Sequence, residues 1–172
     1  MRLAVVIGTG RINNMSAVVA KYIARVLESK SVEVILVDPK DHLTSPITVR
    51  VGKETDGPSR WQDIAKSVDG FVVVLPEYNR SYPGELKLLI DQLYTEYKHK
   101  PFYPVGVSDG STGGARAVEA FLHVIVGVEG IPIKSKLFFP MVDQMFDKDG
   151  SIKDKSYDEK VLRIVDAMTP LI

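Results

Sequence analysis

Short apolar runs alternate along the chain with segments of helical periodicity. The runs cover residues 3–7, 32–37, 70–75, 103–107 and 133–139. The first three are rich in Val and Ile without polar alternation, which is typical of strands buried on both faces. The alternation predicts a parallel sheet covered by helices on both sides, with these three strands at its centre.

The segments between the runs carry apolar side chains at the spacing of an amphipathic helix. Helices are predicted at residues 16–28, 59–69, 83–97, 115–128 and 158–168. The helix at 83–97 has the strongest stripe, because its apolar residues recur three and four positions apart as far as Tyr97. Five strand–helix units follow from this pattern.

One connection, residues 38–58, is much longer than the others and is interrupted by several Pro and Gly residues. Its run at 47–51 could form a small strand of its own. Long loops inside compact domains are commonly functional. This one follows the second strand at the carboxyl edge of the sheet, where folds of this class bind ligands.

Composition narrows the class of protein. The 172 residues are 45% hydrophobic and 26% charged, as expected for one domain spanning residues 1–172. Lys+Arg and Asp+Glu number 22 each, and this zero net charge argues against binding to nucleic acid or to a membrane surface. No apolar run is long enough for a signal peptide or a membrane span, so a cytoplasmic location is expected.

The side chains that usually build metal or thiol sites give no signal. The absence of cysteine excludes disulfides, zinc-thiolate sites and thiol nucleophiles. The three histidines share no metal-ligand spacing, and the aspartates between residues 143 and 149 lack the closing glutamate of a calcium loop. No metal site is predicted.

The loop after the first strand has the residue types of a phosphate site. Residues 8–16 combine small residues for tight turns, Arg11 for a charge-assisted contact and a helix start with free N–H groups. In a purely structural interpretation, the glycines form a turn and Ser16 is an N-cap. In a third interpretation, Gly8-x-Gly10 together with Asp38 belongs to a dinucleotide-binding fingerprint, although Asn13 occupies the position of its third glycine.

Two further loops reach the same edge of the sheet. Residues 76–87 follow the third strand with a cluster of Glu, Tyr, Asn, Arg and Ser, which suits a flat heteroaromatic ligand. Residues 108–116 follow the fourth strand and contain three glycines, which allow the backbone to approach a ligand closely. For Gly113 and Gly114, tight packing of the helix on the strand is an equally good explanation.

The loop after the third strand carries Pro76-Glu77-Tyr78-Asn79-x-Ser81-x-Pro83-Gly84-x-Leu86-Lys87, followed by Asp91-x-Leu93. This run resembles the central signature of the NADPH-dependent FMN reductase family, especially its bacterial quinone and chromate reductases. The first loop is similar to the family's phosphate loop through Thr9, Arg11 and Ser16. The third is similar to its Ser-x-Gly…Gly-Gly-x-Arg loop.

The resemblance implies a flavodoxin-like three-layer α/β sandwich with a five-stranded parallel sheet in the order 2-1-3-4-5. It implies bound FMN, with the phosphate held by Thr9, Arg11, Asn14 and Ser16. It places the isoalloxazine edge against Pro76, Glu77, Tyr78 and Asn79 and against the loop of Ser108, Gly110 and Ser111. Ser81 and Tyr82 would line the mouth.

The implied activity is that of an FMN-dependent NAD(P)H oxidoreductase that reduces quinones, flavins or similar small acceptors by hydride transfer through bound FMN. NADPH or NADH would be the electron donor. The cofactor carries this chemistry, so no catalytic side chain is expected. The alternatives are a flavodoxin-like electron carrier and a non-catalytic flavin-binding module. Zero net charge and the glycine-rich loop favour the reductase over the carrier.

The chain is expected to form a homodimer or homotetramer whose interface lies beside the flavin. The predicted helix at 83–97 is followed by more rings than one helix face can bury, and an aromatic surplus is common in interface cores. The residues concerned are Tyr94, Tyr97, Phe102 and Tyr103. The alternative is that these rings cover the sheet edge within one chain. The family resemblance favours pairing.

Overall fold

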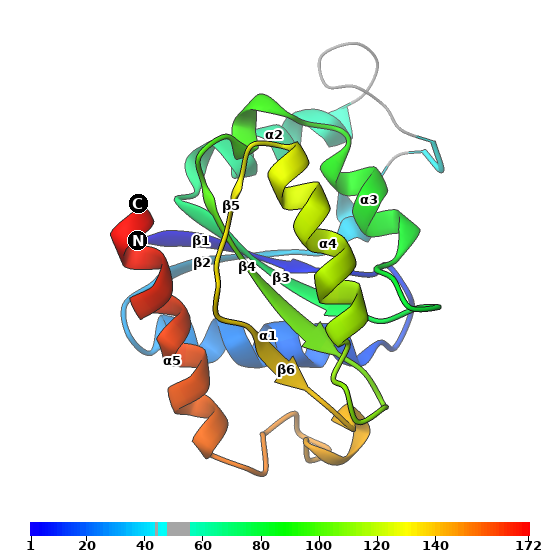
Figure 1. The fold of residues 1–172 in the computed structure, drawn as a ribbon, viewed down its shortest axis with the longest axis vertical. Helices are drawn as coiled ribbons and strands as arrows, with labels where there is room; N and C mark the ends of the chain where they lie inside the picture. The colour runs from blue at the N-terminus through cyan, green and yellow to red at the C-terminus, as the bar shows by residue number, and fades with distance from the viewer. Residues whose placement is uncertain (44, 48–55) are drawn as a thin grey trace.

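A parallel sheet runs through the middle of the molecule, with helices on both faces (Figure 1). The structure, a computed structural model, describes residues 1–43, 45–47 and 56–172. The strands are β1 (Arg2–Ile7), β2 (Glu33–Val37), β3 (Gly70–Pro76), β4 (Pro101–Val107), β5 (Ile131–Pro132) and β6 (Leu137–Phe139). Their order is β2-β1-β3-β4-β5, with β6 also paired to β4, and every pair is parallel. The predicted strand order is confirmed.

The helices are α1 (Met15–Glu28), α2 (Asp56–Ser67), α3 (Gly84–Ile90), α4 (Ala115–Gly127) and α5 (Ser156–Met168). Short 3-10 turns lie at Pro39–Asp41, Thr95–Tyr97, Val142–Gln144 and Thr169–Leu171. Helices α1 and α5 cover one face of the sheet, and α2, α3 and α4 cover the other (Figure 1). None of the helices that the structure describes is both long and apolar enough to cross a bilayer.

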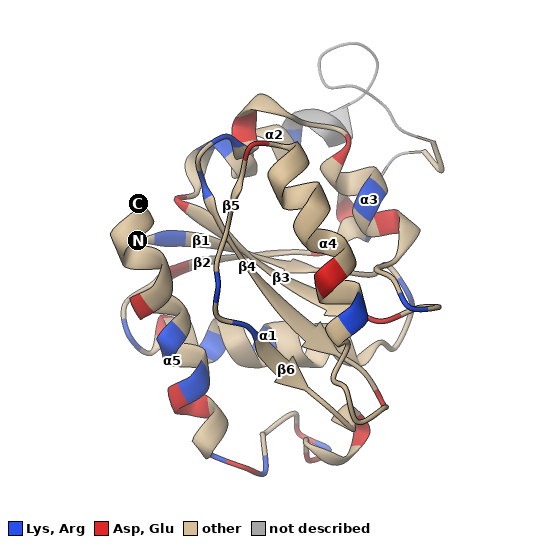
Figure 2. Cartoon of the chain, viewed as in Figure 1, with Lys and Arg blue, Asp and Glu red and all other residues tan. Residues whose placement is uncertain are grey.

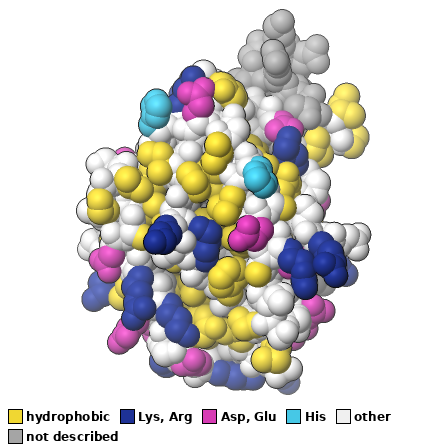
Figure 3. Space-filling model, in the orientation of Figure 1, with side chains coloured by type: hydrophobic (Ala, Val, Ile, Leu, Met, Phe, Trp, Pro, Cys, Tyr) yellow, Lys and Arg dark blue, Asp and Glu magenta, His cyan; other side chains and the backbone are white. Residues whose placement is uncertain are grey.

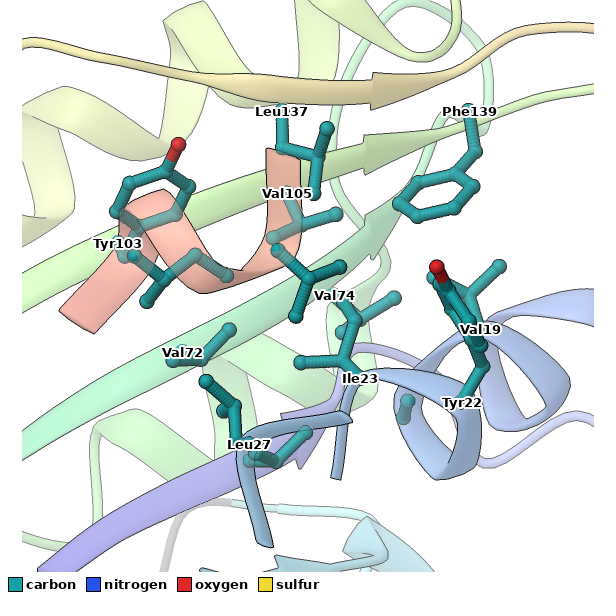
Figure 4. Packing of buried hydrophobic residues seen from close by; sticks show 14 of the residues in the cluster. Val19, Tyr22, Ile23, Leu27, Val72, Val74, Tyr103, Val105, Leu137 and Phe139 are labelled. Carbon is teal, nitrogen blue, oxygen red and sulfur yellow. The ribbon is translucent and has the colours of Figure 1, made fainter. Parts of the chain in front are cut away.

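Alternate side chains of the central strands point to opposite faces, because the side-chain period of a strand is two. Val72 and Val74 of β3 pack against Ile23 and Leu27 of α1, as Figure 4 shows. Their neighbour Val73 points to the other face, into the cluster formed with α2, α3 and α4. Helices therefore cover both faces of the central strands, and a ligand can reach these strands at their ends.

The apolar run at 32–37 predicted a strand at the centre of the sheet, and this prediction is wrong. Among the described residues β2 is the edge strand and pairs with β1 alone. Most of its side chains are partly exposed, with Leu36 40% exposed. An apolar run reports burial, but it does not distinguish a centre strand from an edge strand. The small strand considered at 47–51 lies outside the described residues from position 48 onward.

The fifth apolar run, predicted as one strand over 133–139, is two short strands in the structure. β5 ends at Pro132, and the Ile133 N–H that follows still donates to the Phe102 carbonyl of β4 at 2.9 Å. Between the strands the Lys136 amine donates to the carbonyls of Ile133 and Lys134, so these two carbonyls bond a side chain instead. The chain then returns to β4 through β6.

Helix α3 ends at Ile90, seven residues before the end of the predicted helix at Tyr97. Two buried side chains donate hydrogen bonds to the last carbonyls of α3, where a longer helix would have supplied backbone N–H groups. The Trp61 indole N–H donates to the Leu89 carbonyl at 3.1 Å, and the Tyr97 hydroxyl donates to the Ile90 carbonyl at 3.1 Å. Because these terminal carbonyls already have partners, the chain can turn here without leaving buried acceptors unsatisfied.

The prediction that a surplus of aromatic rings forms an interface core is wrong for three of the four rings. Tyr97, Phe102 and Tyr103 are at most 3% exposed, and the Phe71 and Phe102 rings stack with centroids 4.6 Å apart. Of the four rings assigned to an interface, only Tyr94 remains accessible, at 48%. Since helix α3 is short, the chain folds back and buries these rings on the sheet. They cover the sheet within one chain.

Candidate functional site

A cleft of about 540 Å³ opens at the carboxyl edge of the sheet. It lies between the ends of β1, β3 and β4 and is lined by residues 11–16, 76–78, 107–109 and 142–143. The strand order reverses between β1 and β3, and such a switch point is where doubly wound sheets bind ligands. The three loops singled out in the sequence meet here.

The first turn of α1 forms one end of the cleft. Its N-cap is Asn14, whose Oδ1 accepts the Ala17 N–H at 2.7 Å and whose Nδ2 donates to the Arg11 carbonyl at 2.5 Å. Ser16, considered as the cap, is instead inside the helix and 1% exposed. Backbone N–H groups in this first turn have no partner within the helix, and the helix dipole is positive here. This end suits an anion.

Arg11 extends from the loop before this turn. Its guanidinium carbon lies 6.0 Å from the centroid of the Tyr78 ring, which belongs to the loop after β3. The side chain lines the cleft, and within the described part of the chain it forms no ion pair. A free guanidinium beside a helix N-terminus strengthens the case for a phosphate or another anion.

Thr9 has a different place from the one that the resemblance implied. It is 0% exposed and does not line the cleft. Its hydroxyl donates to Glu85 Oε1 at 2.7 Å and accepts the Arg11 N–H at 3.2 Å. The hydroxyl therefore bonds the protein behind the cleft wall.

The loop after β3 presents Pro76, Glu77 and Tyr78 to the cleft. Tyr78 and Ser81 exchange two backbone hydrogen bonds, of 2.9 and 3.0 Å, around a tight turn. The two central residues of this turn, Asn79 and Arg80, have φ values of 50° and 69°, the left-handed geometry of a hairpin turn. The turn carries Asn79 to an exposed tip, and neither Asn79 nor Ser81 lines the cleft.

Tyr82, expected at the mouth of the site, faces α4. Its ring meets the Phe121 ring edge-on, with centroids 5.4 Å apart. It lines a separate hollow of about 840 Å³ between α3 and α4. The short β-turn before it reverses the chain direction, so successive side chains of the signature serve two different surfaces.

The loop after β4 reaches the cleft through Ser108 and Asp109. The Ser108 hydroxyl donates to the Gly110 carbonyl at 3.1 Å, and its backbone carbonyl accepts the Val142 N–H at 3.0 Å. Gly110 itself and Ser111 lie outside the cleft lining. Asp109 belongs to the predicted loop but was not singled out as a site residue, and the Val142–Asp143 segment was not predicted.

Two features fix this loop to its neighbours. Glu77, with a side chain 13% exposed, forms an ion pair of 3.0 Å with the Arg116 guanidinium at the start of α4. Gly114 has φ 82°, and a Cβ there would lie 2.7 Å from the Val107 nitrogen. Gly114 is therefore required by packing, which was the structural alternative for it, and the Glu77 charge is already paired.

These contacts describe a slot with two chemically different ends. The first turn of α1 and Arg11 form one end, with the Tyr78 ring beside Arg11, and the backbone of the strand ends forms the other. A volume of about 540 Å³ lies in the usual range for small-molecule sites. The arrangement suits a flat ligand that ends in a phosphate.

The sequence profile of a family described as NADPH-dependent FMN reductase matches residues 1–144. The chain belongs to this NADPH-dependent FMN reductase family. Its cofactors are therefore FMN and NADPH or NADH, as predicted from the signature.

Known proteins agree with this assignment. A NADPH azoreductase from Bacillus sp. is 28% identical over 153 residues, which cover 88% of this chain and 82% of the relative. The flavoenzyme FerB, an NAD(P)H:acceptor oxidoreductase from Paracoccus denitrificans, has a TM-score of 0.78 at 24% identity over 99% of this chain and 96% of its own. A flavodoxin mutant from Pseudomonas aeruginosa has a TM-score of 0.64 at 16% identity, covering 98% and 99%. The structural likenesses show a flavodoxin-like fold.

Proposed function

We propose that this chain acts as one FMN-binding domain, residues 1–172, that reduces quinones, free flavins or similar small acceptors with electrons from NADPH or NADH. The observation that carries the proposal is the cleft, where an unpaired Arg11 and a helix N-terminus stand at one end of a slot between three loops. The azoreductase similarity supports a small, flat acceptor. The nicotinamide donors point to the cytoplasm as the place of reaction.

The α1 end of the cleft would hold the FMN phosphate. Arg11 would supply a charge-assisted contact, Ser16 a hydroxyl, and the first turn of α1 its free N–H groups. Asn14 would contribute through the cap that fixes the helix start. This set fits one terminal phosphate, which favours FMN over FAD.

The other end would hold the isoalloxazine ring, between residues 76–78 and the Ser108–Asp109 loop. Bound FMN supplies the redox chemistry, taking two electrons from the nicotinamide nucleotide and passing them to the acceptor. The chain's part is to orient the ring and limit its contact with water. Because the Glu77 carboxylate is paired with Arg116, no free side-chain acid or base of this loop is required.

The experiment is reconstitution of the apoprotein with flavin, followed by anaerobic addition of NADPH. We expect stoichiometric FMN binding, bleaching of the yellow colour by NADPH or NADH, and return of the colour on adding a quinone. Steady-state rates should follow ping-pong kinetics, because donor and acceptor would use the same flavin face in turn. Binding of FMN without bleaching would favour the electron carrier, and binding of FAD in its place would contradict the proposal.

We also propose that two copies pair through the α3–α4 face, not through the buried aromatic rings. Charge on α4 is confined to its N-terminal half, and hydrophobic side chains gather over the same face (Figures 2 and 3). Tyr94 is 48% and Val126 62% exposed beside the 840 Å³ groove. Sedimentation at micromolar concentration tests this, and a fully active monomer of 19.1 kDa would contradict it.

A further inference from the structure

One carboxylate oxygen holds the loop after β1. Glu85, in the first turn of α3, accepts two hydrogen bonds at Oε1: the Thr9 hydroxyl at 2.7 Å and the Gly10 N–H at 3.1 Å. The Thr9 hydroxyl in turn accepts the Arg11 N–H at 3.2 Å and lies 3.4 Å from the Tyr78 hydroxyl. Three consecutive residues of the loop are thus linked to a single side chain.

The loop has little other support. Among the described residues, no backbone–backbone hydrogen bond involves residues 9–13, in contrast to Gly8, whose N–H donates to the Val74 carbonyl. Asn14 holds the far end of the loop through the Arg11 carbonyl. The conformation between these two anchors therefore depends on Glu85 and Thr9.

The bonds to Glu85 are of the strong kind. A carboxylate oxygen is the acceptor and its partner Thr9 is fully buried, so the hydrogen bond is of the charge-assisted kind and partly buried. The start of α3 favours a negative side chain through the helix dipole. Glu85 does not line the cleft, so its carboxylate acts from behind the wall.

We infer that Glu85 is a positioning residue: it shapes the loop that presents Arg11 to the FMN phosphate, without touching the cofactor. The inference rests on the proposed function of the cleft. In the first loop, Thr9 and Arg11 then have different roles. Thr9 connects the loop to Glu85, and Arg11 faces the ligand. We therefore expect Glu85 to serve the phosphate end of the cleft specifically.

The test compares FMN with riboflavin, which lacks the phosphate, on apoprotein carrying Glu85→Ala or Glu85→Gln. Quenching of flavin fluorescence gives both affinities, and thermal unfolding of the apoprotein gives stability. We expect Glu85→Ala to weaken FMN binding about tenfold, the loss typical of one charge-assisted hydrogen bond. Riboflavin affinity should stay within about twofold, because the loop serves the phosphate. Glu85→Gln should retain most of the FMN affinity, since its amide oxygen can accept the same two bonds.

The matched control is Glu159→Ala, which removes an exposed glutamate from the first turn of α5. It should change neither affinity. If Glu85→Ala does not fold, Thr9→Val supplies the second variant: it keeps the side-chain shape, removes the hydroxyl and should weaken FMN selectively. Equal losses for FMN and riboflavin, or none, would overturn the inference. Wild-type protein that binds no flavin would instead refute the proposed function.

Discussion

The cleft at the sheet edge and the groove between α3 and α4 differ in size and in chemistry. The groove between α3 and α4 is the larger, at about 840 Å³ against about 540 Å³ for the cleft at the sheet edge. Charged groups in the groove pair with each other, as in the Lys87–Asp91 ion pair of 2.5 Å, while apolar side chains cover much of the rest. The cleft instead brings together the first turn of α1 and Arg11, which forms no ion pair among the described residues. Volume alone would not have selected the cleft that we propose as the cofactor site.

The difference follows from how each hollow is built. Helix faces that pack against each other leave grooves rich in apolar atoms, and another protein surface can cover these. Loops at the carboxyl ends of parallel strands bring backbone N–H groups and polar side chains together from distant parts of the sequence. The cleft therefore suits a charged small molecule, and the groove suits a second copy of the chain.

The largest expected effect is at the cleft. Arg11→Ala removes the guanidinium proposed to contact the FMN phosphate and should cost about 1.5–3 kcal/mol of binding, or about 10- to 150-fold in Kd. Calorimetric titration of the apoprotein measures this. Arg80→Ala is the control, because Arg80 lies on the nearby exposed turn outside the cleft lining. Equal affinity of Arg11→Ala and wild type would mean that this end binds another group.

The buried core beside α3 should behave in the opposite way. Tyr97→Phe removes a buried hydroxyl that donates to the Ile90 carbonyl and accepts the Trp61 indole N–H at 3.0 Å. The Ile90 carbonyl still accepts the Leu93 N–H, and the Trp61 indole N–H still donates to the Leu89 carbonyl. Urea unfolding of the apoprotein should therefore show a loss of about 0.5–1.5 kcal/mol, the usual net worth of a hydrogen bond. FMN affinity should not change. A loss of affinity without a loss of stability would contradict the separation of the two regions.

A pair of variants separates the cap of α1 from the phosphate contact. Asn14→Ala removes the N-cap and should lower stability by about 1 kcal/mol. Ser16→Ala leaves the cap in place, so it should weaken FMN by about 0.5–1.5 kcal/mol and leave unfolding unchanged. Denaturation and titration of both variants check this. Destabilisation by Ser16→Ala would return the capping role to Ser16.

The smallest expected effect is on pairing. His123 is exposed and lines the groove, so His123→Glu would place equal charges on the two copies across a two-fold interface. Repulsion between exposed charges is worth roughly 0.5–1 kcal/mol, which predicts a dimer weaker by about two- to fivefold in sedimentation. Lys21→Glu, on the other face of the sheet in α1, should leave the dimer unchanged. FMN affinity should be the same in all three proteins.

The sequence predicted the class of fold, the strand order through the family resemblance, and half of the residues that line the cleft. Periodicity is a local property, so β1, β3, β4 and α1 could be predicted within a few residues. The signature residues Pro76, Glu77 and Tyr78 line the cleft because a strand end points its residues at one edge. Arg11, Asn14, Ser16 and Ser108 line it for the same reason.

Only the tertiary structure decided where burial and hydrogen bonds place each remaining side chain. An apolar run could not show that β2 is an edge strand, and a helical stripe could not show that α3 stops at Ile90, because a distant indole and phenol bond its last carbonyls. Nor could a motif show that Thr9 turns inward to Glu85, a contact between residues 76 positions apart. Such contacts depend on which segments meet in space. Sequence patterns describe a residue's neighbours along the chain, whereas the hydrogen-bond partners named here are distant in sequence.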